Sequence, residues 1–208
     1  MVLASHETSN LLNRPPPVNA FEYLSVLISI ILALGMTRLL GGVGEMLQAR
    51  ARRHVYWVHA MWIVNLFLCL VIQWWILYRW RNQQRWTFFL FIFVLIAPTL
   101  LYLASLLLFP READIDVAVD YRAHYYGNHR AFFILLASFI AADVPDTLLK
   151  GIPHLVELGP QYILSMVLYL GGLTVAAITS NERYHQFYAI FFLIVTIWNS
   201  VAFFRTLA

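Results

Sequence analysis

The stretch WTFFLFIFVLIAPTLLYLASLLLF, residues 86–109, contains 24 consecutive residues without a charged side chain. A membrane-spanning α-helix needs about 20 predominantly apolar residues. No water reaches the backbone in the hydrocarbon layer, and a helix satisfies its own N–H and C=O groups there. Residues 86–109 are therefore predicted to form a transmembrane helix.

Five other apolar runs of similar length surround this one. They predict helices at residues 21–47, 54–78, 121–149, 161–180 and 184–204. Residues 1–20 contain three consecutive prolines and are predicted to form an extramembrane N-terminal arm, stiffened by polyproline geometry. The predicted fold class is all-α: an integral membrane bundle of about six transmembrane helices.

The composition of the 208 residues agrees with a membrane protein. Hydrophobic residues make up 61%, charged residues only 12%, and the mean hydropathy is +0.69. Soluble domains are nearer half apolar and a quarter charged. Most of the basic residues behind the net charge of +3 flank the apolar runs, where they anchor helices at the headgroups. We expect the lipid bilayer, and no nucleic acid, as a partner.

The predicted helix at residues 121–149 is the least regular of the six. Its clean apolar stretch, Ala131–Ala142, covers about half a span and is followed by Asp143, Pro145 and Asp146. Proline removes a backbone donor and clashes with the preceding turn. We expect this helix to kink, to end early or to form part of a re-entrant segment. Broken backbone at membrane depth is tolerated only where it contacts protein or water.

The six runs divide into two halves of similar length. Three helices in each half would invert the second half relative to the first, an arrangement that many transporters use, with interrupted helices at matching positions. Here Gly41, Gly42 and Gly44 are expected to interrupt the first helix, as the Asp–Pro–Asp segment interrupts the fourth. The pattern is one of spacing, without residue-level similarity between the halves.

Arg38 is the residue of the first helix that costs the most free energy to place in the membrane, because its charge lies only about 7.5 Å beyond the middle of the apolar run. Glu45 follows two turns later on the same face. Ionisable groups at this depth usually face the bundle interior and have a partner. Arg38 is a candidate for binding an anion or for setting the field along a pathway. Snorkelling or a structural ion pair is the alternative.

Asp143 and Asp146 flank Pro145 on one helical face, with Lys150 one turn further along. Two neighbouring buried carboxyls retain a proton readily, so this pair is a candidate for proton uptake. Cation coordination or an ion pair with Arg38 is also open. The alternative is a helix that ends near Ala142, with both carboxylates in a hydrated loop.

Asp116, Asp120 and His124 are spaced by four residues and would share one face of a helix. Carboxylate and imidazole groups on adjacent turns can hold a divalent metal, so these residues form a candidate metal site. The alternative is the polar face of an interfacial helix that leads into the membrane. A bis-histidine haem is a weaker hypothesis, and no cofactor is predicted.

Narrow polar stripes indicate which faces of the other helices turn inward. The stripes comprise Asn65, Cys69 and Gln73; Thr99 and Tyr102; Gln161, Ser165, Tyr169 and Gly172; and Thr196, Asn199 and Ser200. Small and polar side chains join membrane helices by close packing and hydrogen bonds, and the lining of a pore has the same pattern. Tryptophans around the second connection, Trp80 among them, are expected at the membrane interface.

The chain has no motif of a soluble enzyme. A P-loop, GxGxxG, GxSxG and HExxH are all missing from its sequence. The one cysteine, Cys69, excludes an intrachain disulfide. We therefore expect a protein that is not an enzyme.

The N-terminal half resembles small bacterial inner-membrane proteins of unknown function. The resemblance is carried by Phe21–Ile30, by Leu34–Thr37, by a basic connection with Arg50, Arg52 and Arg53, and by Trp74–Trp75 late in the second helix. It implies a multi-pass protein of the bacterial inner membrane. It carries no known activity, so no functional residue transfers.

Two classes of function are open at this point. In the first, the protein is a small translocator or channel for protons, ions or a small solute, with Arg38, Asp143 and Asp146 along the path and Glu45 in support. In the second, it is a non-catalytic subunit or scaffold of a larger membrane complex. A metal- or haem-binding membrane protein is a weaker third class. We expect a homo-oligomer or a subunit of such a complex.

Overall fold

A computed structural model describes residues 20–48, 55–83, 85–110, 120–149 and 152–203. They form six α-helices: α2 (Ala20–Gln48), α3 (Trp57–Leu77), α4 (Phe88–Leu107), α5 (Tyr121–Leu149), α6 (Ile152–Ile178) and α7 (Glu182–Phe203). A short 3₁₀ helix, η2 (Tyr78–Asn82), follows α3. No β-strand occurs in these ranges, and the prediction of a six-helix, all-α bundle is confirmed. The predicted N-terminal arm lies outside the described residues except for Ala20.

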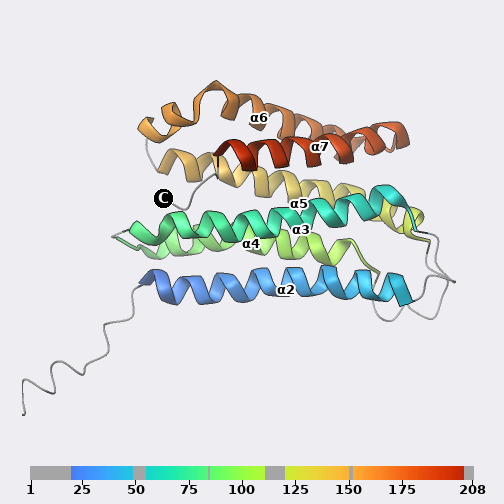
Figure 1. Ribbon diagram of the computed structural model, residues 1–208, viewed down its shortest axis with the longest axis horizontal. Helices are drawn as coiled ribbons and strands as arrows, with labels where there is room; N and C mark the ends of the chain where they lie inside the picture. The colour runs from blue at the N-terminus through green and yellow to red at the C-terminus, as the bar shows by residue number, and fades with distance from the viewer. Residues whose placement is uncertain (1–19, 49–54, 84, 111–119, 150–151, 204–208) are drawn as a thin grey trace, which may run out of the picture.

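The helices run along a common axis, and the start of α2 and the end of α7 lie at the same end of the bundle (Figure 1). The helix contacts close a ring, in which α2 packs on α4, α4 on α5, α5 on α6, α6 on α7, α7 on α3 and α3 on α2. The two halves of the chain pack differently, because α2 lies along α4 whereas α5 packs chiefly on α6. The helix contacts therefore do not repeat between the first three helices and the last three.

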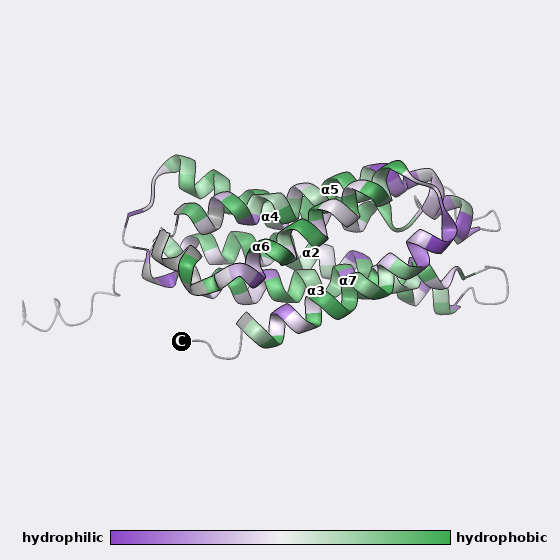
Figure 2. Ribbon diagram, turned by 90° about the horizontal axis from the view of Figure 1, so that it is seen from above, coloured by the Kyte–Doolittle hydropathy of each residue, from purple (hydrophilic) through white to green (hydrophobic). Residues whose placement is uncertain are grey.

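Five of the helices, α2, α3, α4, α6 and α7, are long and apolar enough to cross a membrane. Their outer faces carry large exposed apolar side chains, such as Ile30, Val64, Phe89, Leu164 and Ile194. Figure 2 shows hydrophobic residues along the helices and a cluster of hydrophilic residues at the end where α5 and α7 begin. Apolar surface of this extent suits contact with lipid. The protein is a multi-pass membrane protein.

The helix α5 is not among these five, yet it runs alongside α4 and α6. Its 29 residues extend about 44 Å at helical rise. It continues through Pro145 to Leu149, so the expected early end near Ala142 and the re-entrant segment are both wrong. Pro145 lies one turn before the end of α5, where the loss of its N–H removes a single helical hydrogen bond.

The backbone break of this bundle lies in α6. There Gly159 has φ 67° and ψ −175° and is followed by Pro160. Glycine adopts a positive φ at little cost, and proline suits the first turn of the helix that follows. By contrast, α2 continues through the glycine-rich segment Gly41–Gly44, so the expected interruption there is wrong.

Two glycines serve close packing instead. A β-carbon on Gly42 would clash with the ring of Phe109, and one on Gly172 would clash with the ring of Tyr188. Small residues let membrane helices and their neighbours approach closely. Gly42 therefore sets the distance between α2 and the residues after α4, and Gly172 sets the distance between α6 and α7.

An aromatic core joins α3, α5 and α7. The fully buried ring of Trp62 lies 5.6 Å from that of Phe132, 5.0 Å from that of Phe133 and 5.2 Å from that of Phe192, measured between ring centroids. Tilted and edge-to-face aromatic pairs at these distances stabilise a core beyond their burial. These four residues, the Trp62 core, fill the space between the three helices.

We expect Gly42→Ala and Gly172→Ala each to destabilise the bundle by about 1–3 kcal/mol, because the buried rings of Phe109 and Tyr188 must move. Thermal unfolding of the purified protein in detergent measures the change. Gly41→Ala and Gly171→Ala are matched controls, since a β-carbon at either position meets no atom within 4 Å. Equal destabilisation within each adjacent pair would contradict the packing role.

Candidate functional site

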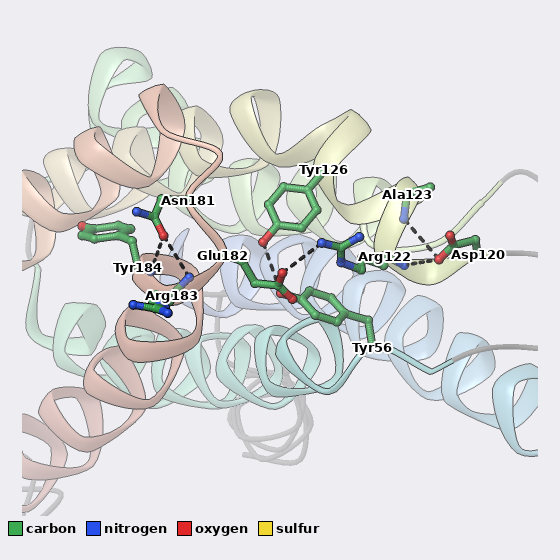
Figure 3. Close-up of polar contacts among 9 residues, drawn as sticks. All are labelled: Tyr56, Asp120, Arg122, Ala123, Tyr126, Asn181, Glu182, Arg183 and Tyr184. Atoms are coloured by element: carbon green, nitrogen blue, oxygen red, sulfur yellow. Dashed lines mark hydrogen bonds and ion pairs between the residues drawn. The ribbon is translucent and has the colours of Figure 1, made fainter.

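One end of the bundle, where α3, α5 and α7 begin, is held by a polar clasp of Tyr56, Arg122, Tyr126 and Glu182 (Figure 3). Arg122 Nη2 lies 2.9 Å from Glu182 Oε2, and the hydroxyl oxygens of Tyr56 and Tyr126 are 3.2 Å apart. Burial raises the pKa of Tyr56, and the neighbouring Tyr126 and Glu182 raise it further, so the phenol stays neutral. The clasp ties the starts of three helices together.

Asp120 caps α5 at this end. Its Oδ1 accepts hydrogen bonds from the backbone N–H groups of Arg122, at 2.8 Å, and Ala123, at 3.3 Å (Figure 3). Asn181 caps α7 in the same way. Such caps supply acceptors to the first N–H groups of a helix, which have no partner within it.

The three predicted metal ligands are not seen as one group. Asp116 lies outside the described residues, Asp120 forms the cap, and His124 Nε2 lies 3.1 Å from the backbone oxygen of Leu107. Within the ranges that the structure covers, no three His, Cys, Asp or Glu side chains gather closely enough to hold a metal ion. Asp120 and His124 both take part in hydrogen bonds that fix the start of α5.

Arg38 lies toward the clasp end. Its Nη2 donates a hydrogen bond to the backbone oxygen of Pro110 at 2.9 Å, and its guanidinium carbon is 5.4 Å from the ring centroid of Phe109. Among the described residues, no carboxylate forms an ion pair with Arg38, and no basic residue forms one with Glu45. The structure places Arg38 against the residues that follow α4, and away from Asp143.

Asp143 lies near the opposite end of the bundle, where α5 ends. The hydroxyl of Tyr162 donates a hydrogen bond to Asp143 Oδ2 at 2.9 Å. Tyr162 belongs to the first turn of α6 after the break at Gly159. The side chain of Asp146 lies outside the described part of the structure. Asp143 and Tyr162 thus join α5 to α6 beside the break.

Asp143 lines a cavity of about 180 Å³ inside the bundle, with walls from α3, η2, α4, α5, α6 and α7. The polar lining residues are Gln73, Asp143, Thr147, Tyr162, Ser165, Tyr169, Thr196, Asn199 and Ser200. The other aromatic lining residues are Trp80, Phe93, Phe139 and Phe192, and most of the remainder are aliphatic. Polar side chains of four helices therefore meet at one place.

Tyr169 connects the polar residues on one wall of the cavity. Its hydroxyl oxygen lies 3.1 Å from Thr196 Oγ1 and accepts a hydrogen bond from Asn199 Nδ2 at 3.2 Å. Ser165 Oγ donates to Asn199 Oδ1 at 3.1 Å. Each of these groups has a partner, which makes its burial in an apolar bundle tolerable. The network holds α6 against α7.

The predicted polar stripes supply much of the cavity lining. The stripe residues on its wall are Cys69, Gln73, Ser165, Tyr169, Thr196, Asn199 and Ser200. Sequence reasoning missed Tyr162, although it precedes Ser165 by three residues and Tyr169 by seven and so shares their helical face. Trp80, expected at the membrane interface, is buried on the cavity wall beside Trp86.

No protein-family model, no curated protein and no solved structure matches the chain. The chemistry of the cavity is therefore the basis for inferring function. It combines one carboxylate with neutral hydrogen-bonding groups and aromatic rings, a composition typical of small-ligand sites. The carboxylate favours a cation over an anion.

We expect Tyr169→Phe to destabilise the protein by about 1–3 kcal/mol, because it removes a hydrogen-bond partner from both Thr196 and Asn199. Arg122→Gln should leave the unfolding temperature nearly unchanged, since the Arg122–Glu182 pair is exposed and solvated. Thermal unfolding in detergent measures both variants, with Tyr23→Phe on the exposed face of α2 as the matched control. A larger loss from Arg122→Gln than from Tyr169→Phe would contradict this ranking.

Proposed function

We propose that the protein is a small membrane translocator that moves a proton, another small cation or a small cationic solute through the cavity beside Asp143. The supporting observation is the convergence of polar side chains from α3, α5, α6 and α7 on one cavity in an apolar bundle. Ionisable groups within membrane bundles are costly and typically mark ion or substrate pathways. Arg38 contacts the other end of the bundle, so the proposal assigns the charge of the site to Asp143.

The backbone break in α6 supports the same function. Leu158 and Tyr162, on either side of Gly159 and Pro160, both line the cavity. The break lies at the start of the apolar span Leu158–Ile178, and irregular backbone in a membrane protein is tolerated where it is buried in protein or lines a water-filled cavity. Transporters commonly build their solute sites from such discontinuous helices.

The cavity has a packed barrier on one side. Along α3 it extends from Cys69 toward Trp80 in η2, at the end of the bundle where α5 ends. The Trp62 core lies on the other side, toward the clasp, and shares Phe192 with the cavity wall. Alternating access requires a site that is closed on one side in each state. We therefore propose that solute enters from the Asp143 end.

The proposed location is the inner membrane of a bacterium. Five helices long and apolar enough to span a membrane support a membrane location in general. The resemblance of Phe21–Ile30 and Leu34–Thr37 to bacterial inner-membrane proteins supports the particular membrane.

Flux into proteoliposomes tests the function. We expect protons, rubidium or labelled phenethylammonium to enter faster than into protein-free liposomes, and Asp143→Asn to reduce that entry several-fold by removing the charge. A trapped pH-sensitive dye reports protons, and radioactive tracers report the other two cations. Asp120→Asn is the matched control, because it makes the same chemical change at a helix cap where asparagine serves equally well. Entry of all three probes at the protein-free rate, or entry unaffected by Asp143→Asn, would overturn the proposal.

Thiol labelling tests the one-sided access. In a Cys69→Ser background, Ser200→Cys places a thiol on the cavity wall and Ile197→Cys places one on the exposed outer face of α7. A charged, membrane-impermeant thiosulfonate should label Ser200→Cys from one face of the vesicle and leave Ile197→Cys unlabelled, because the reaction needs a hydrated thiolate. Labelling of Ser200→Cys from both faces, or from neither, would contradict a cavity open on one side.

A further inference from the structure

The lining of the cavity also indicates the chemical class of its ligand. We infer that the cavity binds a monovalent organic cation, a single aromatic ring on a short ammonium tail, with the ammonium group beside Asp143. This assignment rests on the proposed function in taking the cavity as the solute site, but it concerns affinity, which is measured apart from transport.

The size of the cavity limits the ligand. Its volume is about 180 Å³. An apolar protein cavity of about 150 Å³ is large enough to hold benzene. The space therefore fits one six-membered ring with a short tail.

The charge of the lining selects a cation. Asp143 is the one charged residue among the described residues that line the cavity, and no lysine, arginine or histidine is among them. An ionised carboxylate can accept about four hydrogen bonds at once, and the Tyr162 hydroxyl donates one to Asp143. A hydrogen bond between an ammonium group and a carboxylate is of the strong, charge-assisted kind.

The donor set favours an organic cation over a divalent metal ion. Hard divalent cations take six or more oxygen ligands, usually several of them carboxylates. The described residues contain no cluster of three potential metal ligands at all. The cavity instead offers the rings of Trp80, Phe93, Phe139 and Phe192, which attract an ammonium group through their faces and pack against an apolar body.

The polar groups on the α6 and α7 wall of the cavity already have hydrogen-bond partners within the protein. Tyr169, Thr196, Asn199 and Ser165 bond to one another, and Ser200 Oγ donates to the backbone oxygen of Thr196 at 2.7 Å. Because these groups are already satisfied, a ligand gains little by carrying hydroxyl or amide groups to meet them. An aromatic body with one ammonium group therefore matches this wall of α6 and α7 better than a polyhydroxylated sugar would.

Isothermal titration calorimetry on the full-length protein in detergent tests the assignment with two probes of the same shape, phenethylammonium and neutral 2-phenylethanol. We expect the wild type to bind the ammonium compound at least about tenfold more tightly than the alcohol. Asp143→Asn should remove this preference while retaining the affinity for 2-phenylethanol, which shows that the cavity is intact. Asp143→Glu should restore part of the preference, and Asp120→Asn should match the wild type.

Equal affinity of the wild type for the two probes would overturn the ligand class, and this comparison needs no variant to fold. A preference for the ammonium compound that survives Asp143→Asn would also overturn it. If protons or rubidium cross in an Asp143-dependent way but phenethylammonium does not bind, the proposed ligand class is wrong and the proposed translocator function stands. If phenethylammonium binds but no probe crosses the membrane, the proposed translocator function is wrong and the proposed ligand class stands.

Discussion

Polar side chains on membrane helices cannot remain unpaired against lipid, and this constraint orders the whole bundle. A hydroxyl or amide without a hydrogen bond in an apolar medium costs several kcal/mol. Most stripe residues of α6 and α7 therefore turn inward, where Tyr169, Thr196 and Asn199 supply one another with partners, whereas the stripe residue Gln161 is exposed. Asp143 follows the same rule on α5, with Tyr162 of α6 as its donor. The inward turn of these groups places polar side chains on the wall of a largely apolar cavity.

The bundle consequently has two regions with different packing. Toward the clasp, large rings around Trp62 fill the interior, and Phe109 and Tyr188 approach glycines too closely to admit a methyl group. Toward the other end, the helices surround the cavity, and the backbone of α6 breaks at Gly159. Close packing gives low compressibility, so the first region forms a rigid base for the second.

Local sequence was a good guide to the helices and a poor guide to their interruptions. Runs of apolar residues located all six helices to within a few residues, except that α6 begins with an extra helical segment before Gly159. Pro145 did not end α5, because near a helix end a proline removes one hydrogen bond that the packing of α5 on α4 and α6 outweighs. Glycine permits both a bend and a close approach, and only the position of Phe109 shows which of these Gly42 serves.

The sequence by itself determined the fold class, the number of helices and the inward faces of α3, α6 and α7. These depend on hydropathy and helical period, which are properties of neighbouring residues. Tertiary structure alone decided which of these faces meet at the cavity, that Tyr162 bonds to Asp143, and that Arg38 bonds to Pro110, 72 positions along the chain. Those pairings depend on how six helices pack, and a local pattern contains no information about which distant residue will lie within hydrogen-bonding distance.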